Sequence, residues 1–340
     1  MPSEPAALRL VPSNGREPEL REQSRRQQGW AGVEIGVESM EVSFCDTSLL
    51  RIAYLSGGPE DGPPVLFLHG WPDDATTFAD IVPSVQADGF RTVTPWLRGF
   101  GKTIFRSNET MRSGEIAAMA QDTIDLADAL GLGRFAVVGH DWGARIAYLL
   151  ASVLPERITC CAALSLGWQP GLPATPHLEQ AMAFWYQWFM ATRPGEEAVR
   201  EHGRAFARFL WDTWSPAGWF DDESFNSVAK SFENPDWVDV TLHSYRVRWD
   251  EAKPDPCYAE LARKQISANT IAVPTLTLHG DEDRVVLATS SEAKGRYFSA
   301  SYDRRLLAGI GHFPTREAPE QVLEAIREFL AAFAQGNAPA

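Results

Sequence analysis

The sequence has few basic residues and no long hydrophobic run, and each shortage excludes a class of function. It contains 31 Lys and Arg against 45 Asp and Glu, which gives a formal net charge of -14. Nucleic acids and anionic membrane surfaces are bound by clustered Lys and Arg, so we expect neither as a partner. No apolar run is long enough to span a bilayer, and Arg25 and Arg26 are followed by no hydrophobic region of the signal-peptide type. We therefore expect no membrane anchor and a location in the cytoplasm.

Cysteine is scarce as well, with four residues in the chain. Cys160 and Cys161 are adjacent in an apolar run typical of a buried strand, whereas Cys45 and Cys257 stand alone. This spacing matches neither a disulfide framework nor a zinc site. We expect no metal and no other cofactor, and a reducing environment.

The chain divides into a polar start and a folded remainder. Residues 1–36 are rich in Pro, Ser, Glu, Gln and Arg and lack periodicity, which predicts a flexible extension. Short apolar runs then alternate with helical patterns over 37–167 and again over 265–335, as expected for an α/β core with a mostly parallel sheet. Between them, residues 168–264 are helix-like and crowded with Trp and Phe. We interpret this segment as an inserted helical cap.

The stretch "VVGHDWGAR" places Asp141 where a buried strand turns into a helix. Gly139 and Gly143 supply the small neighbours that a strained turn of the nucleophile-elbow type needs, and such elbows usually carry serine. Later motifs offer its partners in the order expected for a catalytic triad: an acid in "LHGDEDRVV" and His312 in "GIGHFP". Asp283 is the favoured acid, with Asp281 and then Glu282 as alternatives, all three within that first motif.

A carboxylate nucleophile restricts the chemistry. Attack on an ester or amide would give a mixed anhydride, whereas attack on an electrophilic sp³ carbon gives an alkyl ester that water can cleave. His312, oriented by Asp283, would activate that water, and backbone N–H groups of Trp71 and Trp142 would form the oxyanion hole. For His69, which precedes Trp71 in "LHGWPD", we expect a structural role with its ring bonded to loop backbone.

In order, the motifs "LFLHGWPD", "PWLRGFGKT", "VVGHDWGAR", "LHGDED" and "GIGHFPTREAPE" resemble those of the α/β-hydrolase superfamily over roughly 40–333. The Asp elbow is similar to that of its epoxide hydrolase and haloalkane dehalogenase branches. The resemblance implies an α/β-hydrolase fold with a helical cap. One departure is "TPWLRGFG", where Trp96 and Leu97 replace the acidic residue usual before the turn.

Two tyrosine segments in the cap favour the epoxide branch. "FWYQWF" and "LHSYRVRW" resemble the cap-tyrosine segments of epoxide hydrolases, giving Tyr186 and Tyr245. The resemblance implies that these residues hold and protonate the ring oxygen of an epoxide, while Gln187 and Trp142 contact the substrate. The expected reaction converts an epoxide and water to a vicinal diol.

Two alternatives stay open. A haloalkane or haloacid dehalogenase would use the same triad without needing the tyrosines, because it has to hold a departing halide. A non-catalytic relative would bind a ligand and form no product. A homodimer is compatible with the sequence.

Overall fold

The computed structural model describes residues 41–334, so the extension predicted at 1–36 lies outside the described residues. Within this range the strands form one nine-stranded sheet in the order β1-β2-β4-β3-β6-β7-β8-β9, and β5 pairs with β2. The strands are β1 (Ser43–Asp46), β2 (Leu50–Gly57), β3 (Pro64–Leu68), β4 (Arg91–Pro95), β5 (Ile104–Phe105), β6 (Phe135–His140), β7 (Ile158–Leu164), β8 (Thr275–Gly280) and β9 (Tyr302–Leu307).

The sheet is parallel from β4 through β9 and antiparallel only where β1, β2 and β5 join it. Both faces of its centre are buried, since every residue of β6 and β8 is buried. Strands that are covered on both sides read as continuous apolar runs, which is why the sequence pattern was informative. The predicted α/β class with a mostly parallel sheet is confirmed.

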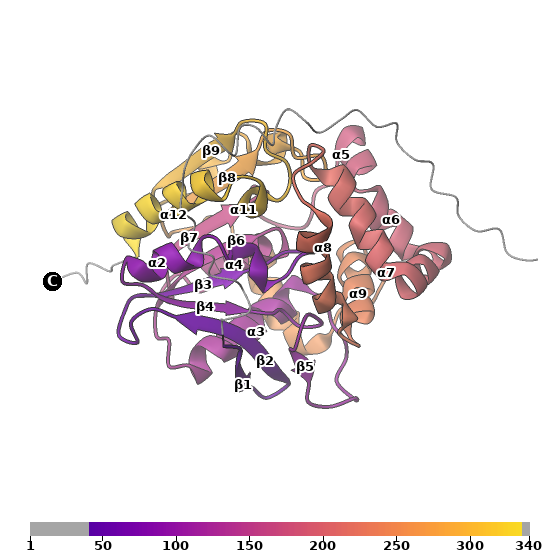
Figure 1. The fold of residues 1–340 in the computed structure, drawn as a ribbon, viewed down its shortest axis with the longest axis horizontal. Coiled ribbons are helices and arrows are strands. Elements are labelled where there is room, and N and C mark those ends of the chain that lie inside the picture. The colour runs from indigo at the N-terminus through magenta and orange to yellow at the C-terminus, as the bar shows by residue number, and fades with distance from the viewer. Residues whose placement is uncertain (1–40, 335–340) are drawn as a thin grey trace, which may run out of the picture. The chain divides into compact units, whose positions relative to one another are not determined.

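Helices cover the two faces of the sheet in separate layers (Figure 1). Side chains alternate along each strand, so Phe67 packs with α2 (Val82–Ala87) and α12 (Pro319–Phe333). Its neighbours Leu66 and Leu68 pack on the opposite face with α3 (Ile116–Ala129) and α4 (Trp142–Val153). The short α11 (Pro314–Glu317) precedes α12.

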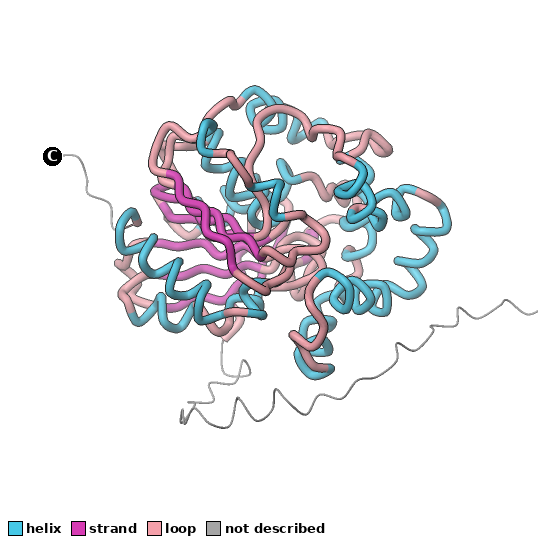
Figure 2. Tube along the Cα trace, turned by 90° about the horizontal axis from the view of Figure 1, so that it is seen from above, coloured by secondary structure: helices cyan, strands magenta, loops and turns pink. Residues whose placement is uncertain are grey.

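Between β7 and β8 the chain is helical and forms a group beside the sheet, as Figures 1 and 2 show. Its helices are α5 (Leu178–Ala183), α6 (Trp185–Ala191), α7 (Arg193–Trp214), α8 (Asp222–Ala229), α9 (Trp237–Arg248) and α10 (Ala259–Ser267). The last of these, α10, contacts α3 and α4 of the sheet layers. We call α5 to α9 the cap helices; the boundary of the predicted cap at residue 264 stays a prediction.

Hydrogen bonds connect the cap helices, and the loop before α9, to the loops that follow β3 and β4. The Trp71 indole donates to Thr241 Oγ1 at 2.9 Å, and the Trp211 indole donates to the carbonyl of Pro72 at 2.7 Å. Asn234 Nδ2 donates to the carbonyl of Thr103 at 2.7 Å. The loop after β3 borders Asp141, because the Trp71 N–H donates to Asp141 Oδ1, so the cap helices lie next to the candidate site.

None of the helices in 41–334 is both long and apolar enough to cross a membrane. All four cysteines are free thiols. In the same range, no cluster of His, Cys, Asp and Glu has the arrangement of a metal site.

Candidate active site

Asp141 occupies a strained turn between β6 and α4. Its backbone has φ 50° and ψ -108°, a conformation that costs a non-glycine residue energy and that functional sites often retain. The turn closes tightly, because a Cβ on Gly143 would lie 1.9 Å from the Leu68 carbonyl oxygen. A Cβ on Gly139 would meet the Gly143 carbonyl oxygen at 2.1 Å. Both glycines are therefore required for the turn that presents the Asp141 carboxylate.

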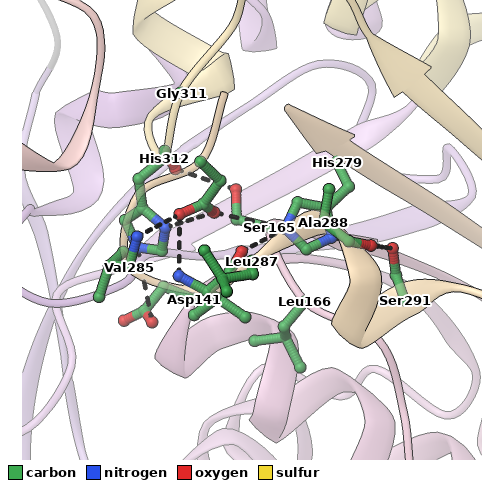
Figure 3. A network of polar contacts seen from close by, with 12 residues as sticks. Asp141, Ser165, Leu166, His279, Val285, Leu287, Ala288, Ser291, Gly311 and His312 are labelled. Carbon is green, nitrogen blue, oxygen red and sulfur yellow. Dashed lines mark hydrogen bonds and ion pairs between the residues drawn. The ribbon is translucent and has the colours of Figure 1, made fainter. Parts of the chain in front are cut away.

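The three triad candidates lie together at the ends of β6 and β8 and in the loop after β9. Figure 3 shows Asp141 beside His312. His312 Nδ1 is 2.8 Å from Asp283 Oδ2, and His312 Nε2 is 3.7 Å from Asp141 Oδ2. The other oxygen of Asp283 accepts the backbone N–H groups of Val285 and Val286, each at 2.9 Å. His312 Nε2 is buried and has no hydrogen-bond partner, so it is free to take a proton at the face toward Asp141.

The backbone of His312 is held from two sides. Its N–H donates to Ser215 Oγ at 2.8 Å, and Ser215 directly follows the cap helix α7. Its carbonyl accepts the Ser165 hydroxyl at 2.9 Å and lies 2.7 Å from His140 Nε2. Burial and the neighbouring His312 lower the pKa of His140 to about 4, so His140 is a neutral donor to this carbonyl. The imidazole of His312 is thus fixed relative to both carboxylates.

The surroundings of Asp283 and His312 determine the charge state of each. Burial acts to raise the pKa of Asp283, but the His312 charge and hydrogen bonds from His279 and His312 outweigh it and hold that pKa well below its usual range. Burial likewise acts to lower the pKa of His312, and the Asp283 carboxylate outweighs it, so the net pKa is raised. An ionised Asp283 beside a moderately basic His312 is the arrangement that a general base requires.

The backbone N–H of Trp71 donates to Asp141 Oδ1 at 3.0 Å. The register of β3 against β6 pairs Leu68 with Gly139, which brings the loop after β3 level with the elbow. Trp142 is the first residue of α4, where backbone N–H groups have no partner within the helix. Oδ1 therefore faces one predicted oxyanion donor, the Trp71 N–H, and Oδ2 faces His312; the part of the Trp142 N–H stays a prediction.

Tyr186 on α6 and Tyr245 on α9 meet above this site, with ring centroids 5.2 Å apart. The oxygen of Tyr186 accepts Gln187 Nε2 at 2.8 Å, and the oxygen of Tyr245 accepts the Trp142 indole at 3.2 Å. Burial is the main reason that the pKa of each phenol is raised, and the Asp141 charge adds to it. Both phenols stay protonated and can donate.

Gln187 was expected to contact the substrate, but protein groups occupy both ends of its amide. Nε2 donates to Tyr186, and Oε1 accepts the Trp249 indole at 2.8 Å. The Trp142 indole is likewise engaged with Tyr245. The geometry places these two side chains as supports of the tyrosines, and their contact with substrate stays a prediction.

The alternative acids lie away from the histidine. Asp281 is exposed and accepts the Gly309 N–H at 2.7 Å, and Glu282 is exposed beside Arg284. The ring of His69 forms hydrogen bonds with loop backbone, as expected: Nδ1 with the carbonyl of Gly70 and Nε2 with the N–H of Leu97.

A pocket of about 670 Å³ borders the site where α5 and α6 face the loop after β8. Its lining includes Trp185, Trp214 and Asp283. Trp214 also packs edge-on against His312, with ring centroids 5.1 Å apart, and lies 4.9 Å from the Tyr186 ring. The pocket is therefore bordered by Trp214 and Asp283, both of which contact His312.

Sequence reasoning missed Ser165, Ser215 and His279, which support His312 or Asp283 through side-chain contacts. The two serines carry no signal, because their contacts span 147 and 97 residues of sequence. His279 has a weak signal, since a histidine at the end of an apolar strand four residues before the acid requires polar partners.

Comparison with known proteins agrees with the fold. The family model described as alpha/beta hydrolase fold matches residues 63–318. A solved structure from Klebsiella pneumoniae, named as a candidate epoxide hydrolase, superposes with a TM-score of 0.80 at 33% identity, covering 85% of this chain and 97% of that one.

Two curated proteins resemble nearly the whole folded region. Epoxide hydrolase A of Mycobacterium tuberculosis is 25% identical over 321 residues, covering 84% of this chain and 95% of the relative. Fluoroacetate dehalogenase of a Burkholderia species is 26% identical over 308 residues, covering 86% and 94%. The relatives therefore include both reaction types that an Asp nucleophile allows.

Proposed function

The chain belongs to the α/β-hydrolase fold family, in its epoxide-hydrolase-like branch, and from this we propose that it hydrolyses a small or medium epoxide to a vicinal diol. The observation that carries the proposal is the pair of protonated tyrosines, Tyr186 and Tyr245, above the Asp141 carboxylate. The phenol oxygens accept hydrogen bonds from Gln187 and Trp142, and the two hydroxyls also bond to each other. An epoxide oxygen between them would replace that mutual bond and accept from both hydroxyls.

In the first step, Asp141 Oδ2 attacks an epoxide carbon and the carbon–oxygen bond of the ring breaks. The developing alkoxide takes a proton from a tyrosine, so the products of this step are an alkyl ester and a hydroxyl group. A neutral alcohol is a far better leaving group than an alkoxide, and two positioned donors stabilise the oxygen as charge develops on it.

In the second step, His312 takes a proton from a water that attacks the Asp141 ester carbon. The oxyanion forms on Oδ1, which the Trp71 N–H faces at 3.0 Å. On collapse, the bond between the carboxyl carbon and the ester oxygen breaks, and that oxygen, which came from Asp141, leaves in the diol. It takes the proton of the hydroxyl that water added, so Asp141 is again a carboxylate, and the proton held by His312 restores the tyrosine. Epoxide and water are consumed in equal numbers, and no cofactor takes part.

The indole contacts favour this reaction over dehalogenation. A dehalogenase has to stabilise a departing halide with N–H donors that point into the site. Here the Trp71 indole donates to Thr241 and the Trp142 indole donates to Tyr245, so neither is free. Dehalogenation remains the second candidate because one relative is a fluoroacetate dehalogenase.

The test is a product assay with styrene oxide and aliphatic epoxides beside a bromoalkane and fluoroacetate, following diol and halide. We expect diol formation that is lost in Asp141→Ala. Halide release without diol would move the protein to the dehalogenase reaction. No product from any compound, together with tight ligand binding, would favour the non-catalytic alternative.

A further inference from the structure

A second histidine, His279, lies behind the catalytic acid candidate. It is the next-to-last residue of β8, is fully buried, and its Nε2 lies 3.4 Å from Asp283 Oδ2, the oxygen that also contacts His312. Figure 3 shows the polar network running from Asp141 through His312 to His279 and Ser291. The carboxylate of Asp283 thus lies between two imidazoles.

The neighbours of His279 determine which of its atoms carries a proton. Nε2 is 2.8 Å from the carbonyl of Val286, and a carbonyl can only accept, so Nε2 carries a hydrogen. Nδ1 is 2.9 Å from Ser291 Oγ, which accepts Arg304 Nε at 2.8 Å. The Nε2–H therefore donates to the Val286 carbonyl, and Asp283 Oδ2, at 3.4 Å, is the second and longer contact of the same N–H.

We propose that His279 is a positioning residue whose Nε2–H shares the Asp283 oxygen that orients His312, and that this sharing limits the strength of His312 as a base. Two N–H groups divide the negative charge of one oxygen, so each receives a weaker bond than it would alone. The consequence is a His312 that gives up its proton more readily and is neutral over more of the physiological pH range. As a statement about catalysis, this rests on the proposed function.

The groups facing His312 make the direction of the effect definite. Three carboxylates stabilise its protonated form, namely Asp283, Asp141 and Glu317, and His140 is a neutral neighbour. His279 lies on the other side of Asp283. Its ring contacts Ser291, and Ser291 accepts a hydrogen bond from the Arg304 guanidinium. Removing the His279 donor leaves more charge on Asp283 Oδ2 and so must raise the pKa of His312.

The test compares two substitutions of similar size. Leucine removes the N–H donor at the position of Nε2. Glutamine retains a donor there, because its amide nitrogen lies where Nε2 lies in histidine. We expect His279→Leu to raise the midpoint of the His312 titration by about half to one pH unit, the shift equivalent to one net hydrogen bond. His279→Gln should shift it by less than half as much.

The readout is the titration of the His312 Cε1–H resonance by NMR in protein with labelled histidines. The chain has seven histidines, and His312→Asn assigns the resonance. This measurement does not depend on turnover, so failure of the proposed epoxide reaction would leave it intact. Where epoxide is hydrolysed, the acid limb of the single-turnover rate of ester hydrolysis should move by the same amount.

Thr277→Val is the matched control. Thr277 is a buried residue of the same strand, and its hydroxyl bonds Tyr148 at 2.9 Å and not the acid. It should leave the His312 midpoint unchanged. A His279→Leu midpoint that is unchanged or lowered, or equal shifts in the Leu and Gln variants, would overturn the proposal. If His279→Leu does not fold, His279→Asn, whose shorter amide cannot reach the place of Nε2, must raise the midpoint, and no movement there would likewise overturn the proposal.

Discussion

At the scale of single residues, each oxygen of Asp141 has a different neighbour. Oδ1 accepts the Trp71 N–H, and Oδ2 lies 3.7 Å from His312 Nε2. Because the two oxygens have different neighbours, one can act as the nucleophile while the other lies where the oxyanion will form. In the proposed reaction, the two tyrosines donate protons to the oxygen of the epoxide.

Tyr245→Phe tests the tyrosine role. We expect the rate of ester formation to fall about 10–100-fold, because one of two acids that protonate the leaving oxygen is lost, while ester hydrolysis changes little. Single-turnover kinetics separates the two phases. Tyr148→Phe is the control, since Tyr148 is equally buried but bonds Thr277. Equal losses in both phases of the Tyr245 variant would remove that residue from the ring-opening step.

Asp283→Asn tests the acid. His312 acts as a base only when neutral, so ester hydrolysis should rise with pH through the raised pKa of His312. Loss of the Asp283 charge should lower that pKa and move the acid limb to lower pH. The maximal rate should fall about 10²–10⁴-fold, because the imidazole loses its orienting partner. A pH–rate profile of ester hydrolysis in both proteins checks this, and an unmoved limb would contradict it.

At the scale of elements, the elbow depends on close approach of β3, β6 and α4. The Gly143 position meets Leu68 backbone, which cannot move without disturbing β3. Gly133 has open space around its Cβ position and an ordinary φ. These two glycines therefore form a matched pair for mutation.

We expect Gly143→Ala to destabilise the protein by about 1–3 kcal/mol or more through overpacking, and to impair activity. Gly133→Ala should change the free energy of unfolding by less than about 0.5 kcal/mol, as for an ordinary surface substitution. Chemical denaturation of both variants provides the comparison. A Gly143→Ala protein as stable as Gly133→Ala would contradict the close packing of the elbow.

The elements that the sequence predicted well are those with strong local patterns. The buried strand expected before Asp141 is β6, and α3 and β8 lie among the helical patterns and apolar runs expected over 37–167 and 265–335. Buried parallel strands and glycine-flanked turns leave their mark in neighbouring residues. Contacts such as His312 with Ser215, or Gln187 with Trp249, join segments far apart in the chain. They could not be predicted, because the residues next to each partner in sequence do not indicate them.

At the scale of the whole molecule, cap helices and sheet layers share one hydrophobic cluster. Trp71 and Trp142 from the sheet side pack with Tyr186, Trp211 and Tyr245 from the cap helices. A cap whose aromatic face is buried in the same core cannot unfold alone without exposing that core. The site therefore depends on both parts being folded.

We expect the described region to unfold in one cooperative transition. Denaturation followed by far-ultraviolet circular dichroism and by tryptophan fluorescence should give coincident curves, which is the usual test of two-state unfolding. Two separate transitions, with the fluorescence change first, would mean that the cap helices open independently of the sheet.

The central claim is that Asp141 forms a covalent ester, and one isotope experiment tests it directly. In a single turnover in H₂¹⁸O with excess enzyme, the account predicts an unlabelled diol and one ¹⁸O atom in the peptide containing Asp141, since water attacks the ester carbon and the diol takes its oxygen from the carboxylate. A labelled diol and an unlabelled peptide would mean that water attacks the epoxide itself, and would contradict the account.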